Sequence, residues 1–193
     1  IEIYNAQDDE KRIVVKPTTD NTETEAAPIT DKTTEPKKTP VLRVGIICSE
    51  LHHENMEEYK QQFREVDKRL RDKIHLVFYG YEGINEHSEI LEGISYEYVH
   101  RNSIIHYFKQ LGKLELDMLF IPLKKDLFNQ TSENINKFLE VAGFMVPVMV
   151  IDMFPYNQII TNGKNGFLYA KRNNFVTALK NIAEMPREEL RRI

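Results

Sequence analysis

Lys137 and Glu140 lie three residues apart in the sequence and together could bind a ligand that carries phosphate and hydroxyl groups. A lysine ammonium group neutralises phosphate as a compact charge. A carboxylate accepts hydrogen bonds from the hydroxyls of a sugar or ribose. Just before this pair, Ser132, Glu133 and Asn134 are expected to start a helix with Ser132 as its N-cap. The free N–H groups and the dipole of such a helix start favour a bound anion.

Polar residues that follow other predicted strands are further candidates. His52 and His53 follow the first strand after residue 40 and could contact phosphate or sugar. Two adjacent histidines also suit a metal, but no cysteine or carboxylate set completes the site at the usual spacing, so no metal is expected. His100 and Arg101 end a later strand; they either frame a base or are exposed loop residues. Asn129 is interpreted as a turn residue or a ligand contact.

Two turns and one cysteine are interpreted as structural. Pro155 and Tyr156 form a turn, and residues 162–166 form a second turn whose glycines would supply positive φ angles. Cys48 is the only cysteine, so the chain has no internal disulfide, and the residue is expected to act as a small buried hydrophobe. A single cysteine is compatible with a reducing compartment, and we expect a cytoplasmic location.

The stretch from residue 116 to residue 168 must position most of these side chains. We expect a strand at 116–122, a loop at 123–132, a helix at 133–144 and a strand at 147–152. The two strands are nearly continuous apolar runs, typical of strands buried on both faces of a parallel sheet. The helix is expected to pack on the sheet through an apolar face, formed by Ile135, Phe138, Leu139 and Ala142.

The remaining chain continues the alternation of strands and helices. The expected strands are 12–15, 41–48, 74–79, 96–100 and 166–170. The expected helices are 54–73, 102–112 with Gly112 as its C-cap, and 173–185. This order predicts an α/β fold, a doubly wound and mainly parallel sheet with helices on both faces. A Gly-x-Gly-x-x-Gly fingerprint does not occur, so nothing supports dinucleotide binding of that kind.

Length and composition fit one domain preceded by a tail. The chain has 193 residues, 41% of them hydrophobic, and a formal charge of -4. Residues 1–40 are rich in Thr, Pro and charged residues and are expected to form a disordered or extended linker, followed by a Rossmann-like domain at 41–193. No apolar run reaches the ~18 residues of a spanning helix. The mild acidity argues against nucleic acid as a partner.

The residues from 122 to 168 resemble the donor-binding half of GT-B glycosyltransferases, and more narrowly the retaining group 1 family. The resemblance covers about residues 41–192 and depends on a set of short motifs in order and at workable spacing. They are Pro122-Leu123, Phe128-Asn129, Lys137 with Glu140, Pro147-Val148, Pro155-Tyr156 and the run Asn162-Gly163-Lys164-Asn165-Gly166-Phe167-Leu168.

The resemblance implies a glycosyltransferase of polysaccharide or glycoconjugate biosynthesis, of bacterial type, with a nucleotide-diphosphate sugar as donor. It implies a retaining mechanism, no metal and no cofactor. The acceptor-binding domain and the catalytic groups would lie in a missing N-terminal half, which would also carry any peripheral membrane association. The donor-binding residues implied are Glu140, Lys137, Ser132, Glu133, Asn134, Asn129, His53, His100, Arg101, Pro155 and Tyr156.

Two departures from the family pattern leave an alternative open. The family often has a second glutamate eight positions before the one matched by Glu140, and this slot holds Ser132. Met145 replaces the glycine that usually precedes the Pro-Val strand. The alternative is therefore a degenerate, non-catalytic Rossmann-like binding or scaffold module. A flavodoxin-like receiver is a third, weaker reading, because only Glu50 and Glu54 follow the first strand.

Overall fold

The structure is a computed structural model, and it describes residues 12–16, 41–47, 53–80, 88–101, 103–132 and 134–193. Four residues discussed above lie outside these ranges: Cys48, Glu50, His52 and Glu133.

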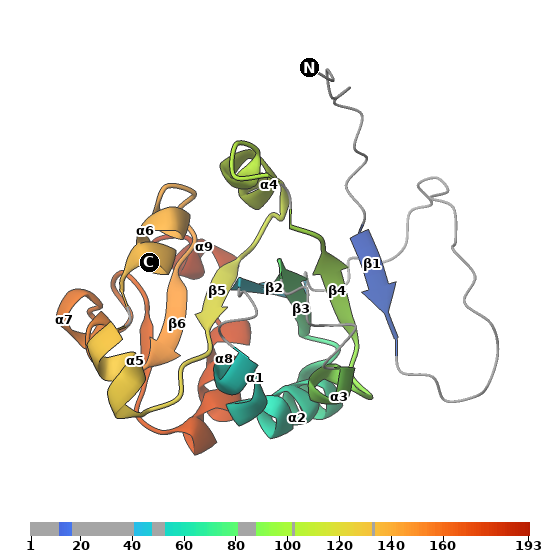
Figure 1. Cartoon of the computed structure of the whole chain (residues 1–193), viewed down its shortest axis with the longest axis horizontal. Coiled ribbons are helices and arrows are strands. Elements are labelled where there is room, and N and C mark those ends of the chain that lie inside the picture. The colour runs from blue at the N-terminus through green and yellow to red at the C-terminus, as the bar shows by residue number, and fades with distance from the viewer. Residues whose placement is uncertain (1–11, 17–40, 48–52, 81–87, 102, 133) are drawn as a thin grey trace.

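Seven strands form a single sheet at the centre of the molecule (Figure 1). Their spatial order is β1-β4-β3-β2-β5-β6-β7. The strands are β1 (Arg12–Val15), β2 (Leu42–Ile47), β3 (Ile74–Tyr79), β4 (Tyr96–Val99), β5 (Met118–Ile121), β6 (Val148–Ile151) and β7 (Phe167–Tyr169).

Strands β2 to β7 are parallel to their neighbours, which confirms the expected parallel sheet. Counted from β2, their order is 3-2-1-4-5-6, the doubly wound arrangement in which the strand order, not the strand direction, reverses between β2 and β5. Ligands of such sheets bind beyond the carboxyl ends of the strands near that reversal. The fold therefore directs the search for a site to this edge.

The first strand, β1, pairs antiparallel with β4. It confirms the strand expected at 12–15. It also lies inside the segment expected to be a linker or tail, so the sheet draws on residues from both sides of position 41.

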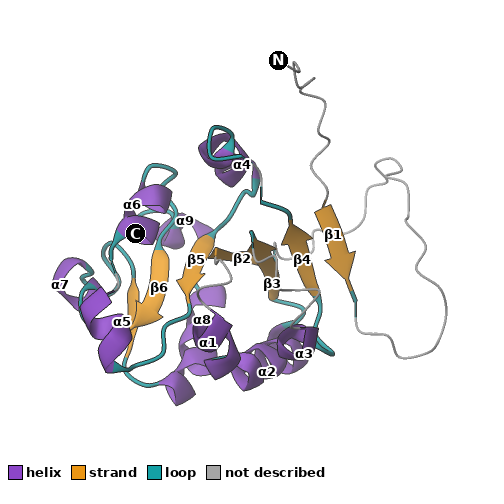
Figure 2. Cartoon of the chain, in the orientation of Figure 1, coloured by secondary structure: helices purple, strands orange, loops and turns teal. Residues whose placement is uncertain are grey.

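Helices cover both faces of the sheet (Figures 1 and 2), with α1, α2, α3 and α8 below it in this view and α4 and α6 above it. They are α1 (His53–Glu58), α2 (Lys60–Leu70), α3 (Ser88–Leu91), α4 (Tyr107–Lys113), α5 (Leu127–Ser132), α6 (Asn136–Ala142), α7 (Tyr156–Ile159), the 3-10 turn η3 (Arg172–Asn174), α8 (Phe175–Ala183) and α9 (Arg187–Leu190).

The helix expected at 54–73 is two helices separated at Tyr59. Its expected apolar face is confirmed, because every member is buried: Met56, Tyr59, Phe63, Val66 and Leu70. Tyr59 lies edge-on against Phe120 of β5 and Phe175 of α8, with ring centroids 5.2 and 5.7 Å apart. The break thus places an aromatic side chain between sheet and helix layers.

The prediction of a loop at 123–132 is wrong, since α5 occupies the second half of this segment. Asp126 begins this helix: its Oδ1 accepts a hydrogen bond from the backbone N–H of Asn129 at 2.9 Å, the geometry of an N-cap. Ser132 consequently ends α5 and does not cap the next helix. That helix, α6, begins at Asn136 after Ile135, which makes no side-chain cap.

The prediction of which residues of this helix face the sheet is also partly wrong. Val141 is its fully buried residue, whereas Leu139 is 56% exposed and Ala142 is exposed. Because α6 starts three residues later and ends two residues earlier than expected, it is only seven residues long, which is about two turns.

Gly112 is not a C-cap, since α4 continues through it to Lys113. A Cβ at Gly112 would lie 2.9 Å from Cε1 of Phe144, so the glycine instead allows the Phe144 ring to lie against α4. The glycines of the 162–166 turn do adopt positive φ, 74° at Gly163 and 157° at Gly166, as expected.

Candidate functional site

A pocket of about 440 Å³ opens at the carboxyl edge of the sheet, beyond the ends of β5, β6 and β7. Its wall on the helix side is the junction between α1 and α2. The lining residues are Glu58, Tyr59, Leu123, Lys125, Ile151, Ala170, Lys171, Arg172 and Asn173. The pocket lies on the carboxyl edge at which doubly wound sheets bind ligands, on the β5–β7 side of the reversal between β2 and β5.

Three cations and one carboxylate line this pocket. Lys125 follows β5, and Lys171 and Arg172 follow β7. Arg172 forms an ion pair with Glu58 across the pocket, and Lys125 Nζ donates to the carbonyl oxygen of Asp152 at 3.1 Å. The net charge of the lining side chains is positive, so the pocket suits an anionic group.

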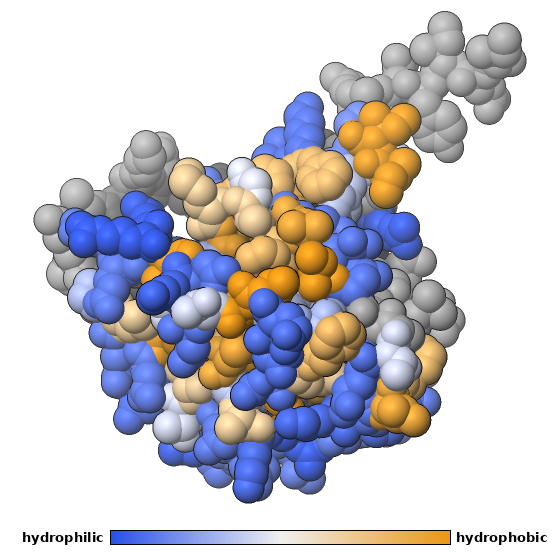
Figure 3. All heavy atoms as spheres, turned by 90° about the vertical axis from the view of Figure 1, so that its left-hand side faces the viewer, coloured by the Kyte–Doolittle hydropathy of each residue, from blue (hydrophilic) through white to orange (hydrophobic). Residues whose placement is uncertain are grey.

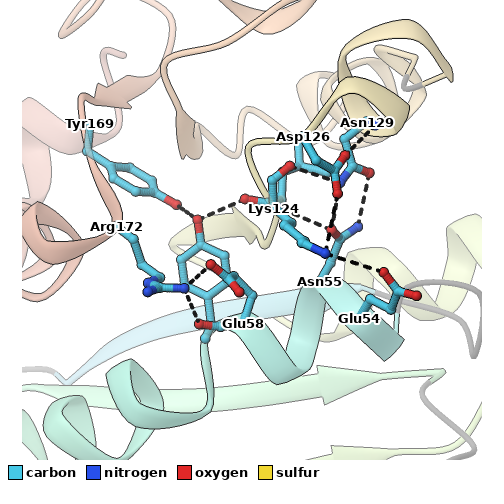
Figure 4. Close-up of polar contacts among 10 residues, drawn as sticks. Glu54, Asn55, Glu58, Lys124, Asp126, Asn129, Tyr169 and Arg172 are labelled. Carbon is cyan, nitrogen blue, oxygen red and sulfur yellow. Dashed lines mark hydrogen bonds and ion pairs between the residues drawn. The ribbon is translucent and has the colours of Figure 1, made fainter.

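Tyr59 lines the same pocket and is hydrogen-bonded to Tyr169 of β7, which Figure 4 labels. The Tyr59 hydroxyl donates to the carbonyl oxygen of Leu123 at 3.0 Å and accepts from the Tyr169 hydroxyl at 2.5 Å. Burial raises the pKa of Tyr59 to about 12, and burial together with Tyr59 raises the pKa of Tyr169 well above its usual value. Both phenols therefore stay neutral at physiological pH and serve to join α2, β7 and the end of β5.

A second group of polar contacts links α1 to the segment after β5 (Figure 4). Asn55 Oδ1 accepts from the backbone N–H of Lys124 and from Asn129 Nδ2, each at 2.9 Å. Asn129 Nδ2 also donates to the carbonyl oxygen of Lys124 at 2.9 Å. Asn55 and Asn129 are both buried. The predicted site residue Asn129 thus holds the two sides of the β2–β5 reversal together.

Glu140 lies on the other face of the sheet, next to α4. Its Oε2 accepts a 2.6 Å hydrogen bond from the Tyr107 hydroxyl, and the Tyr107 ring stacks on Tyr79 at the end of β3. Burial first, and then the Glu140 carboxylate, raise the pKa of Tyr107, while Arg101 acts in the opposite direction. His100 is close by, since its carbonyl oxygen accepts from Gln110 Nε2 of α4 at 3.2 Å. The structure therefore brings Glu140, His100 and Arg101 to one neighbourhood.

The other predicted residues are distributed over α1, α6 and the segment after β6. His53 is the first residue of α1, and half-buried Lys137 is in the first turn of α6. Tyr156 is fully buried, and its hydroxyl donates to the carbonyl oxygen of Asn134 at 2.9 Å. Pro155 precedes α7, so the expected turn continues into a short helix.

None of the predicted site residues lines the pocket. The pocket cations did carry a signal in the sequence, because the basic pairs Lys124-Lys125 and Lys171-Arg172 begin within two residues of the ends of predicted strands. Parallel strands present their carboxyl ends at one edge, so cations in these positions converge whenever the strands are neighbours. Their convergence depends on strand order, which the sequence pattern alone does not specify.

Within the described ranges, no three His, Cys, Asp or Glu side chains gather closely enough to hold a metal ion. A search of the same ranges for a helix long and apolar enough to cross a bilayer also finds none.

Taken together, the parallel strand order and the helices on both faces define a Rossmann-like α/β domain, with a pocket at the carboxyl edge of its sheet. No family model matches the sequence, and no curated protein matches it. Among solved structures, the fold is similar to that of the apo form of WaaB, a lipopolysaccharide outer core galactosyltransferase of the GT-B type.

The similarity to WaaB has a TM-score of 0.54 at 15% sequence identity. It covers 81% of this chain but only 45% of WaaB, so the chain spans less than half the length of that enzyme. At this identity the comparison shows a shared fold. It confirms the Rossmann-like fold expected from the resemblance to GT-B glycosyltransferases.

Proposed function

We propose that this chain is the donor-binding domain of a GT-B glycosyltransferase, and that it binds a nucleotide-diphosphate sugar at the carboxyl edge of its sheet. The observation that carries the proposal is the shared fold, with six parallel strands in doubly wound order that align with part of a galactosyltransferase. The cationic pocket supports it, because a diphosphate needs positive charge at the edge where such folds bind ligands.

Two places on this edge are suited to different parts of the donor. The pocket with Lys125, Lys171 and Arg172 suits the diphosphate, whose negative charge grows as the sugar leaves. Glu140, held by Tyr107, suits the ribose hydroxyls, as the resemblance implies. Lys137 is a further candidate for the phosphates. Transfer to a glycan or glycoconjugate acceptor, with retention and without a metal, would require an acceptor domain in addition to these residues.

Calorimetric titration with UDP, GDP and their sugars tests donor binding. We expect one of these nucleotides to bind in the presence of EDTA, because the proposed site uses lysine and arginine side chains in place of a metal. Lys171→Glu should weaken binding by about tenfold or more through reversed charge in the pocket. Glu140→Gln should weaken it by about the factor of ten that one charge-assisted hydrogen bond represents.

The matched control is Lys68→Glu, an equal charge reversal on the exposed side of α2. Binding to Lys68→Glu should equal that of the unmodified chain. If neither Lys171→Glu nor Glu140→Gln changes the affinity, the ligand binds somewhere else and the proposed placement is wrong.

A specific observation favours the second candidate, a binding module without transferase activity. The contacts between Asn55 and Asn129 bridge the β2–β5 reversal with the protein's own side chains, and Tyr107 already bonds Glu140. In this case no nucleotide or nucleotide sugar would bind in the titrations.

A further inference from the structure

The segment between β4 and β5 carries exposed apolar side chains that the proposed donor site does not use. Ile104 and Ile105 precede α4 and are 77% and 84% exposed, and Phe108 in its first turn is 54% exposed. Phe144 lies against Gly112, one helical turn beyond Phe108, and Met145 beside it is 83% exposed. We call these five residues the α4 apolar surface.

The α4 apolar surface lies on a projecting part of the molecule. In Figure 1, α4 stands at the top, away from the helices below the sheet, and Figure 3 shows apolar side chains in a band that runs from the upper part of one face toward its centre. Neighbouring isoleucine side chains that are this exposed bury little apolar area and so add little to the stability of the fold. Such a group of exposed apolar side chains indicates a contact surface.

Positive charge accompanies these apolar residues. Residues 100–114 contain Arg101, Lys109 and Lys113 and no aspartate or glutamate, whereas the chain as a whole has a formal charge of -4. Arg101, Lys109 and Lys113 are all exposed. A partner with negative charge would therefore be attracted to this segment and repelled by the average surface of the protein.

We propose that the α4 apolar surface docks onto an anionic lipid bilayer. Aliphatic and aromatic side chains at a projecting tip, with Arg101, Lys109 and Lys113 in the same segment, match the requirements of an element that lies in the headgroup region. Ile104, Ile105 and Phe108 would enter the boundary of the acyl chains, while Arg101 and Lys109 pair with lipid phosphates. The resemblance implied that any membrane contact would lie in an N-terminal acceptor domain, whereas these residues belong to the proposed donor-binding domain.

Vesicle cosedimentation of the full chain tests this proposal. The protein should pellet with vesicles of phosphatidylcholine and phosphatidylglycerol at low salt, and remain in the supernatant with phosphatidylcholine alone or at high salt. The pair Ile104→Ser and Ile105→Ser should lower the bound fraction by about tenfold, and Lys109→Glu should lower it by a similar factor.

The matched controls are an apolar pair and a cation outside the surface. Leu127 and Phe128 of α5 are 76% and 73% exposed, and replacing both with Ser should leave vesicle binding unchanged, as should Lys68→Glu on α2. Because all these side chains are exposed, thermal unfolding should confirm that each variant is folded.

Two results would overturn the proposal. In one, the unmodified chain remains in the supernatant with anionic vesicles at low salt. In the other, light scattering shows a dimer that Ile104→Ser and Ile105→Ser convert to a monomer, while vesicle binding does not change; the surface would then be an interface between two copies. Neither experiment measures nucleotide binding, so the membrane proposal can fail while the proposed donor binding holds, and the reverse.

Discussion

At the scale of single residues, the buried phenol of Tyr59 should make the fold less stable at alkaline pH. Its pKa is raised to about 12 in the folded protein by burial, against about 10 in an unfolded chain. Because the pKa is higher in the folded state, the contribution of the neutral Tyr59 phenol to the free energy of unfolding is complete below pH 10. It is lost as the pH rises toward 12.

We therefore predict that the free energy of unfolding falls above pH 10, and that this fall is smaller by about 2 kcal/mol in Tyr59→Phe. The variant should also be less stable at neutral pH, by about 1–3 kcal/mol, because the Leu123 carbonyl and the Tyr169 hydroxyl lose their partner. Denaturant unfolding at a series of pH values measures both effects. Equal slopes above pH 10 in the two proteins would contradict this account.

A second residue-scale prediction concerns Asn129. Replacing it with Ala removes the hydrogen bonds from its Nδ2 to Asn55 and to the Lys124 carbonyl, all in a buried setting. We expect a loss of about 2–3 kcal/mol of unfolding free energy. Asn136→Ala, at an exposed position of α6, is the control and should change stability by less than about 0.5 kcal/mol. Comparable effects from the two substitutions would show that the buried contacts contribute little.

At the scale of elements, the turn before β7 has a strict backbone requirement. Gly166 has a φ of 157°, and a Cβ there would lie 3.0 Å from the carbonyl oxygen of Val148 in β6. Gly166→Ala should destabilise the fold by about 1–3 kcal/mol, since both the strained backbone and the contact must be relieved.

Gly143 provides the matched comparison for this substitution. It follows α6 with a φ of -61°, and a Cβ there meets no atom within 4 Å. Gly143→Ala should therefore be neutral or stabilising by a few tenths of a kcal/mol. Thermal unfolding of the two variants under the same conditions measures the difference. A larger loss of stability from Gly143→Ala than from Gly166→Ala would contradict the proposed backbone requirement of the turn.

The elements also show which parts of the fold the sequence predicts. Strands such as β5 and β6 were predictable because each is a continuous apolar run buried on both faces. The helix α5 was missed because its cap, Asp126, stands among residues such as Asn129 and Thr131 with weak helix propensity. Its start is specified by one side-chain hydrogen bond and not by a periodic pattern.

The candidate site was harder to predict than the fold for a related reason. Glu58, Lys125 and Arg172 come from three separate segments and meet only because β5 and β7 are close neighbours of β6. The sequence-based prediction of the site instead used side chains that are near one another in the sequence, such as Lys137 and Glu140. Local spacing shows which residues share a helix, whereas a pocket between strand ends depends on strand order.

At the scale of the whole molecule, ligand binding should appear as added stability. A nucleotide present at 100 times its dissociation constant contributes about 2.7 kcal/mol to the folded state. For a domain of this size, we expect the unfolding temperature to rise by about 5–10 °C with the nucleotide that binds. Thermal unfolding with and without that nucleotide measures the shift. Lys171→Glu should reduce the shift while Lys68→Glu retains it, and an unchanged temperature with every nucleotide would count against a donor-binding domain.

The short antiparallel strand β1 has a consequence for any shortened version of this protein. It occupies the hydrogen-bonding side of β4 that no other strand of the sheet covers. A fragment that starts at residue 41, the position where the apolar pattern begins, would leave that row of amide and carbonyl groups open to strands from other molecules. Such a fragment should self-associate as its concentration rises, even with an intact core.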